Sequence, residues 1–151
     1  MSERSADSTT YALPNGQLQT STYVAPVRQR VDGVWRNIDT SLSDGGSALK
    51  PEVAAADIAV SDGGDTALAS VTKGARSFGM GWESNLPTPS VTDDTASYAL
   101  GDGETLKVTA LSQGFSQKVV LDKAPDGPVK YRIPMRLRDL CCRWPNPVTC
   151  C

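Results

Sequence analysis

Hydrophobic and polar residues alternate along much of this chain, in short runs separated by turn residues. The clearest run is Glu104 to Leu111, where Leu106, Val108 and Ala110 alternate with polar or charged residues. Successive side chains of a β-strand point to opposite faces, so a period of two predicts a strand with one buried face. The chain therefore favours β-structure in this region.

Neighbouring runs extend the pattern into a predicted four-strand antiparallel meander. Its strands are Ala96 to Leu100, Glu104 to Leu111, Phe115 to Asp122 and Pro128 to Leu137. The last strand has five alternating apolar residues: Val129, Tyr131, Ile133, Met135 and Leu137. Full burial would contribute about 1.5 to 3 kcal/mol per large side chain, so we expect this row to lie in the core. Pro134 cannot donate to a ladder, which favours an edge position or a bulge.

A tight hairpin is predicted around Asp32-Gly33. The flanking runs are Val27 to Val31 and Val34 to Asp39. Asp-Gly tolerates the positive φ angles of the two-residue type I′ turn, which matches the twist of paired strands. This register places Val31 opposite Val34 and Val27 opposite Ile38 on one face, with Trp35 on the other.

Weaker strand signals occur elsewhere. Thr9 to Leu13 and Gln17 to Val24 flank Pro14-Asn15-Gly16, which is a hairpin signal. Further strands are predicted at Ala54 to Val60, Thr66 to Val71 and Ser77 to Trp82. The Gly- and Ser-rich segment Ser41 to Pro51 is predicted to be a loop.

Composition supports one all-β domain. The 151 residues include 13 Gly and 10 Pro but only 2 Phe, which is typical of many turns between short strands. The predicted fold is an antiparallel sandwich or an irregular meander. We expect a disordered N-terminus at residues 1–8, a β-rich module at 9–138 and an irregular Cys-rich tail at 139–151.

Charge and hydropathy exclude several partners. The net charge of −2 creates no overall field that would recruit nucleic acid or anionic lipid. No stretch reaches the ~20 apolar residues that span a bilayer, and the polar Met1 to Thr10 lacks the apolar core of a secretory signal. We therefore expect no nucleic-acid partner and no membrane span.

The chain contains no histidine, which removes the side chain most used for acid–base catalysis near neutral pH. Neither a Ser-His-Asp nor a Cys-His arrangement can be built, and no G-x-S-x-G, phosphate-binding or dinucleotide-binding motif occurs. We therefore predict no enzyme activity, no catalytic residues and no cofactor. The last-ranked alternative is an enzyme that uses carboxylates, for which the sequence shows no paired motif.

Several short patterns together resemble a known protein class. They are Tyr11-x-Leu13-Pro14-Asn15-Gly16, Pro26-Val27, Asp32-Gly33-x-Trp35-x-x-Ile38-Asp39-Thr40, Tyr98 to Leu100, and Gly114-Phe115-Ser116 to Leu121. This series resembles the N-terminal β-rich region of large secreted bacterial surface proteins with RHS/YD repeats or LamG-like modules.

The resemblance implies a non-catalytic β module that precedes repeats and variable C-terminal domains. It implies secretion or a cell-surface location, with the remainder of a larger parent protein or cell-wall glycan as partner. It transfers no catalytic residue. The chain departs from the class because it shows no export signal and ends where further strands are expected. A complete chain without such a signal would stay in the cytoplasm.

All four cysteines lie in the last eleven residues, as Cys141, Cys142, Cys150 and Cys151. The preferred interpretation is free or variably oxidised thiols on a flexible end. The alternatives are a two-disulfide framework like that of small venom peptides and a zinc site, although zinc sites normally use C-x-x-C spacing. A frameshift would also explain the change in composition, which leads to the hypothesis of a truncated gene product.

Three further groups of residues suggest binding. Acidic residues near turns could in principle hold calcium, although turn chemistry explains them better: Asp44, Asp62, Asp65, Asp93, Asp94, Asp102 and Glu104. A basic stripe on one strand face, which could bind phosphate or an anionic wall polymer, comprises Lys130, Arg132, Arg136 and Arg138. Trp35 and Trp82 are expected in the core, with a carbohydrate platform as the alternative. No metal ligand is assigned.

These observations and the resemblance predict a non-catalytic structural module of a secreted or cell-surface RHS/LamG-type protein, in the form of a truncated fragment. The alternative is a carbohydrate- or cell-wall-binding β module.

Overall fold

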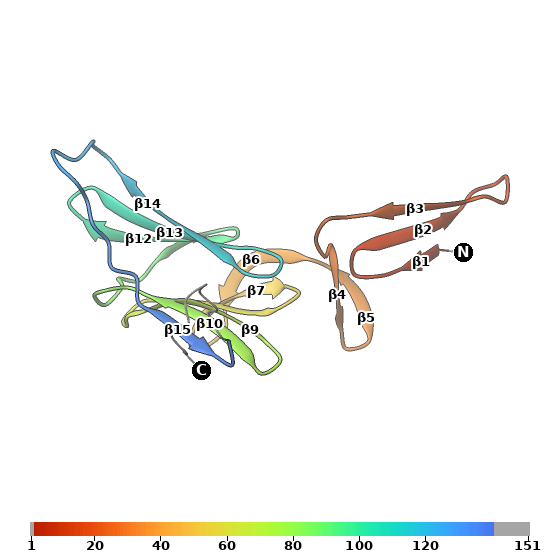
Figure 1. Cartoon of the computed structure of the whole chain (residues 1–151), viewed down its shortest axis with the longest axis horizontal. Helices are drawn as coiled ribbons and strands as arrows, with labels where there is room; N and C mark the ends of the chain where they lie inside the picture. The colour runs from red at the N-terminus through yellow and green to blue at the C-terminus, as the bar shows by residue number, and fades with distance from the viewer. Residues whose placement is uncertain (1, 141–151) are drawn as a thin grey trace, which may run out of the picture.

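The computed structural model describes residues 2–140, and the four cysteines lie outside this range. The described residues form fifteen strands and no helix. This confirms the all-β class predicted from the alternation of apolar and polar residues. The strands belong to four antiparallel sheets (Figure 1).

The N-terminal part of the chain forms two small sheets. The first has three strands in the order β1-β2-β3. Their bounds are β1 Ser2–Arg4, β2 Ser8–Ala12 and β3 Leu18–Thr22. The hairpin β4 Arg28–Val31 and β5 Val34–Asn37 follows. Figure 1 shows the three-stranded sheet at the opposite end of the molecule from the larger sheets.

The β4–β5 hairpin has the predicted turn and register. Asp32 and Gly33 have φ angles of 50° and 82°, as a type I′ turn requires. Val31 lies opposite Val34, and the amide of Ile38 donates to the carbonyl of Val27 at 2.9 Å. The prediction succeeds because Asp-Gly sets this turn locally, without help from distant residues.

The rest of the chain forms a sandwich of two sheets. The six-stranded sheet has the order β15-β10-β9-β8-β7-β6. Its strands are β6 Asp39–Asp44, β7 Leu49–Val53, β8 Asp57–Val60, β9 Ala67–Lys73, β10 Arg76–Gly81 and β15 Met135–Arg138. The four-stranded sheet has the order β11-β12-β13-β14, and Figure 1 shows it lying over the first. Its strands are β11 Ser90–Thr92, β12 Thr95–Gly101, β13 Glu104–Ala110 and β14 Phe115–Leu121.

The core lies between these two sheets. The six-stranded sheet contributes Ile58, Val60 and Leu68, and the four-stranded sheet contributes Tyr98, Leu106 and Val108. In β13 the buried residues alternate as the sequence predicts. Trp82 and Leu86, which follow β10, complete the cluster. Each large apolar side chain buried here contributes about 1.5 to 3 kcal/mol.

The prediction that Pro128 to Leu137 forms the fourth strand of the meander is wrong. Residues 122–134 form no strand, and only β15 pairs, with β10 of the other sheet. Where the chain crosses between the sheets, Tyr131 packs on Trp82, with ring centroids 5.7 Å apart, and its hydroxyl donates to Glu104 at 3.2 Å. Pro134 lies just before β15, which is an edge strand, in agreement with the predicted edge position.

The expected burial of the last apolar row is also wrong. Tyr131 and Ile133 are half-buried, whereas Val129, Met135 and Leu137 are exposed. Alternation in sequence shows that a strand has an apolar face, but it does not show that another layer covers that face.

Two further expectations differ from the structure. Residues 1–8 were expected to be disordered, but β1 pairs with β2 through Ser2, Glu3 and Arg4. Main-chain pairing needs no apolar side chains, so composition misses such a strand. The segment Ser41 to Pro51 was predicted to be a loop, but it contains parts of β6 and β7. The predicted turn chemistry is present only at its centre, where Asp44 accepts from the amide of Gly46 at 2.7 Å.

Candidate functional site

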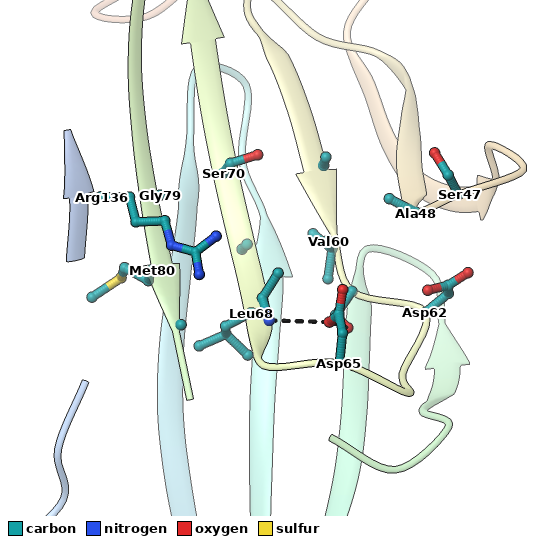
Figure 2. Close-up of a pocket in the computed structure, with 15 residues that line it drawn as sticks. Ser47, Ala48, Val60, Asp62, Asp65, Leu68, Ser70, Gly79, Met80 and Arg136 are labelled. Carbon is teal, nitrogen blue, oxygen red and sulfur yellow. Dashed lines mark hydrogen bonds between the residues drawn. The ribbon is translucent and has the colours of Figure 1, made fainter. Parts of the chain in front are cut away.

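The outer face of the six-stranded sheet carries a shallow trough with a volume of about 220 Å³ (Figure 2). Its floor is a cross-strand row of small residues, Ala59, Ser70 and Gly79, from three adjacent strands. Arg136 of β15 pairs with Gly79 at the end of this row. Small side chains leave room above the sheet, and the trough follows from that.

The two sides of the trough differ in charge. Figure 2 shows Arg136 extending from β15 across β10, while Asp62 and Asp65 lie in the loop between β8 and β9. Asp65 Oδ1 accepts from the amide of Ala67 at 3.0 Å, so this carboxylate also holds the loop. A cation on one side and carboxylates on the other suit a small polar or dipolar molecule.

A buried tyrosine fixes the loop that carries these carboxylates. Tyr98 is fully buried, and its hydroxyl donates to the carbonyl of Ser61 at 2.7 Å. Burial raises the pKa of Tyr98 well above its usual value, and the charges of Asp62 and Asp65 raise it further. The phenol therefore remains a neutral donor at physiological pH.

The predicted basic stripe is only partly a strand face. Arg136 and Arg138 lie on β15 and alternate with Met135 and Leu137. Lys130 and Arg132 precede β15 in the irregular segment, so the four residues do not share one strand. Within residues 2–140 the one ion pair joins Lys50 to Asp57, at 3.1 Å, and none of the stripe residues takes part in it.

The two tryptophans in the described range occupy different environments. Trp82 is 5% exposed and belongs to the core, so it offers no surface for a sugar ring. Trp35 was also expected in the core, but it is half-buried on β5, with the Arg30 guanidinium 5.5 Å from its ring centroid. This cation–π contact covers one face of the Trp35 ring.

Comparison with known proteins identifies no relative. No family model, curated protein or solved structure matches the chain.

Some acidic residues near turns adopt the backbone conformation that hairpin turns use. Asp32, Asp93 and Asp102 have positive φ angles near 50°. Asx residues tolerate this left-handed conformation better than most others.

Among residues 2–140 no three His, Cys, Asp or Glu side chains lie close enough to hold a metal ion. No helix in that range is long and apolar enough to cross a membrane.

Sequence reasoning did not anticipate the trough. Its residues come from β8, β9, β10 and β15, from the loop between β8 and β9 and from the turn between β6 and β7. The floor residues are small and carry no motif, so the signal exists only once the strands are placed side by side.

Proposed function

We propose that this chain is a non-catalytic structural module of a larger secreted or cell-surface protein of the RHS/LamG type. The observation that supports this most is apolar exposure on the last strand. Met135 and Leu137 point to the inner face of the six-stranded sheet but are 65% and 45% exposed.

These two side chains share their face with apolar residues of β10. Leu137 lies opposite Phe78, and Met135 lies opposite Met80. Phe78 in turn stacks on Phe115 of β14, with ring centroids 6.2 Å apart. Within residues 2–140 this apolar face therefore continues to the edge of the sheet without cover, as expected where a neighbouring part of a larger protein would pack.

The coding DNA on both sides of this sequence tests the proposal. We expect an open frame, in one of the three phases, that encodes further β-rich or repeat sequence. Stop codons in every phase on both sides would reject the larger parent protein.

The behaviour of the purified chain provides an independent test. Exposed apolar side chains promote self-association, so we expect the isolated chain to self-associate through them rather than through ordered main-chain pairing of β15. Light scattering and thermal melting under reducing conditions measure this. A monodisperse monomer that melts cooperatively would contradict the proposal.

A second candidate is a carbohydrate- or cell-wall-binding module, favoured by the trough beside Arg136. Its polar rim and small-residue floor could accept a small polar ligand such as one sugar unit. Trp82 is unsuitable for testing this because its loss would damage the core. Glycan-array binding that is lost in Arg136→Gln and kept in Arg132→Gln would support the candidate, and an array without binding would remove it.

A further inference from the structure

Among residues 2–140, no strand pairs with the outer edge of β15, so this edge carries main-chain groups that have no ladder partner in that range. β15 is the terminal strand of its sheet. The amide of Gly81 donates to the carbonyl of Pro134 at 2.7 Å, in the same register that pairs Gly79 with Arg136 and Ser77 with Arg138. Main-chain groups of alternate residues point the same way in an antiparallel ladder, so those of Met135 and Leu137 point to the open edge.

The side chains of β15 divide into two chemical classes. Met135 and Leu137 lie on the inner, apolar face, and Arg136 and Arg138 lie on the outer face. All four are exposed, and neither arginine forms an ion pair within residues 2–140. A strand added here would meet apolar groups on one face and positive charge on the other.

We propose that the β15 edge binds an extended acidic–apolar segment of the parent protein as a seventh strand. Apolar residues of the segment would cover Met135 and Leu137, and its carboxylates would lie opposite Arg136 and Arg138. The main chain would supply affinity and the alternating side chains specificity, as in other strand additions. This inference rests on the proposed function, because it names the partner that the uncovered edge would take.

A second copy of this chain fits the edge poorly. A twofold pairing of two β15 strands through their outward main-chain groups has three central registers. Two of these place Arg136 opposite Arg136 or opposite Arg138 of the second copy, and the third, centred on Met135, overlaps no more than one residue of each β15 strand. Like charges directly opposite each other destabilise an antiparallel pair, so charge selects an acidic partner instead.

Short capped peptides in which valine alternates with glutamate, or with lysine, test the proposal on the full chain under reducing conditions. We expect the glutamate peptide to bind at least about tenfold more tightly than the lysine peptide, which corresponds to about 1.4 kcal/mol. Arg136→Glu combined with Arg138→Glu should reverse this preference. Arg132→Glu, an exposed position outside β15, is the matched control and should preserve it. Equal binding of the two peptides, or no binding of either, would overturn the proposal.

A second measurement locates the bound strand without altering the protein. N-methylation of the peptide amides that face β15 should abolish binding, and methylation of the alternate amides should not. Hydrogen exchange at Met135 and Leu137 should slow by at least about tenfold when the peptide is saturating. Unchanged exchange at both amides, or a dimer that protects them without peptide, would overturn the proposal.

The two levels of inference fail separately. Peptide binding at β15 with stop codons in the flanking DNA would reject the parent protein and therefore the source of the segment. An open flanking frame without peptide binding would reject strand binding at the β15 edge and would not contradict the proposed structural module.

Discussion

Tyr98 is the side chain that joins the core to the loop beside the trough. It extends from β12 through the apolar interior and donates to the carbonyl of Ser61. A buried carbonyl that loses its donor costs more than the net value of the hydrogen bond, because it stays desolvated. One hydroxyl therefore connects the four-stranded sheet to the β8–β9 loop.

Replacing Tyr98 by Phe should lower the free energy of unfolding by about 1 to 3 kcal/mol, since the Ser61 carbonyl is left without its donor. Chemical denaturation at neutral pH measures this loss. Tyr11→Phe, at a tyrosine that is 45% exposed, is the control and should change stability by less than about 0.5 kcal/mol. A neutral effect at Tyr98 would show that the hydroxyl does not hold the loop.

The same residue should make the fold sensitive to alkali. Burial raises the pKa of Tyr98 in the folded state above its unfolded value. The protonated phenol therefore contributes fully to the free energy of unfolding at any pH below the unfolded pKa. That contribution is lost as the pH rises above about 10, where the unfolded chain releases the proton more easily. The alkaline loss of stability should therefore be shallower in Tyr98→Phe than in the wild type. Parallel curves for the two proteins would contradict this.

At the scale of elements, the β8–β9 loop and the segment that follows β10 are joined by main-chain hydrogen bonds. The amide of Gly64 donates to the carbonyl of Leu86, and the amide of Leu86 donates to the carbonyl of Asp65, both at 2.8 Å. The backbone approaches most closely at Gly63, where an added Cβ would lie 2.7 Å from the Pro87 carbonyl oxygen. Only glycine fits there, because the obstruction is main chain.

Gly63 and Gly64 form a matched pair for testing this packing. Both have positive φ, 97° and 88°, but an added Cβ at Gly64 meets nothing within 4 Å. Gly64→Ala should therefore cost only the conformational strain of about 1 to 2 kcal/mol. Gly63→Ala should cost about 1 to 3 kcal/mol more, from the clash with the Pro87–Thr88 backbone. Equal melting temperatures for the two variants would show that the two segments move apart easily.

At the scale of the whole molecule, hydrogen bonds from the Arg28 side chain and from a few main-chain amides join the three-stranded N-terminal sheet to the start of β4. The Arg28 guanidinium donates to the carbonyls of Ser5 and Ser8 at 3.3 and 3.2 Å and to the Thr9 hydroxyl at 2.7 Å. The amides of Val27 and Arg28 also donate to the carbonyl of Ala6. The buried core cluster, in contrast, lies wholly between Ile58 and Val108.

Hydrogen exchange on the full chain should therefore reveal two levels of protection. We expect the amides of β8, β9, β12 and β13 to exchange most slowly and those of β1 to β3 faster. Arg28→Met should speed exchange in β2 by at least about tenfold, since hydrogen bonds to a charged donor are worth about 1.5 to 3 kcal/mol. Exchange in β12 should not change.

Arg30→Met is the control for this prediction, because Arg30 contacts Trp35 within the β4–β5 hairpin and is not hydrogen-bonded to β1–β3. If Arg28→Met accelerates exchange in β12 as much as in β2, the N-terminal sheet and the sandwich unfold together and the two-level description is wrong.

The sequence by itself determined the features that depend on neighbours in the chain. The Asp32-Gly33 turn fixed a hairpin and its register, and the alternation from Glu104 to Ala110 fixed a strand and its buried face. Turn geometry and the period of two are local properties, so they can be deduced without the fold.

Only the tertiary structure decided which strands share a sheet. It moved the last strand from the predicted meander to β10, kept Trp35 only half-buried and left Met135 and Leu137 exposed. It also assembled the trough from Ala59, Ser70 and Gly79, which are far apart in sequence. These outcomes depend on packing between distant segments, and a run of alternating residues specifies an apolar face without specifying what covers it.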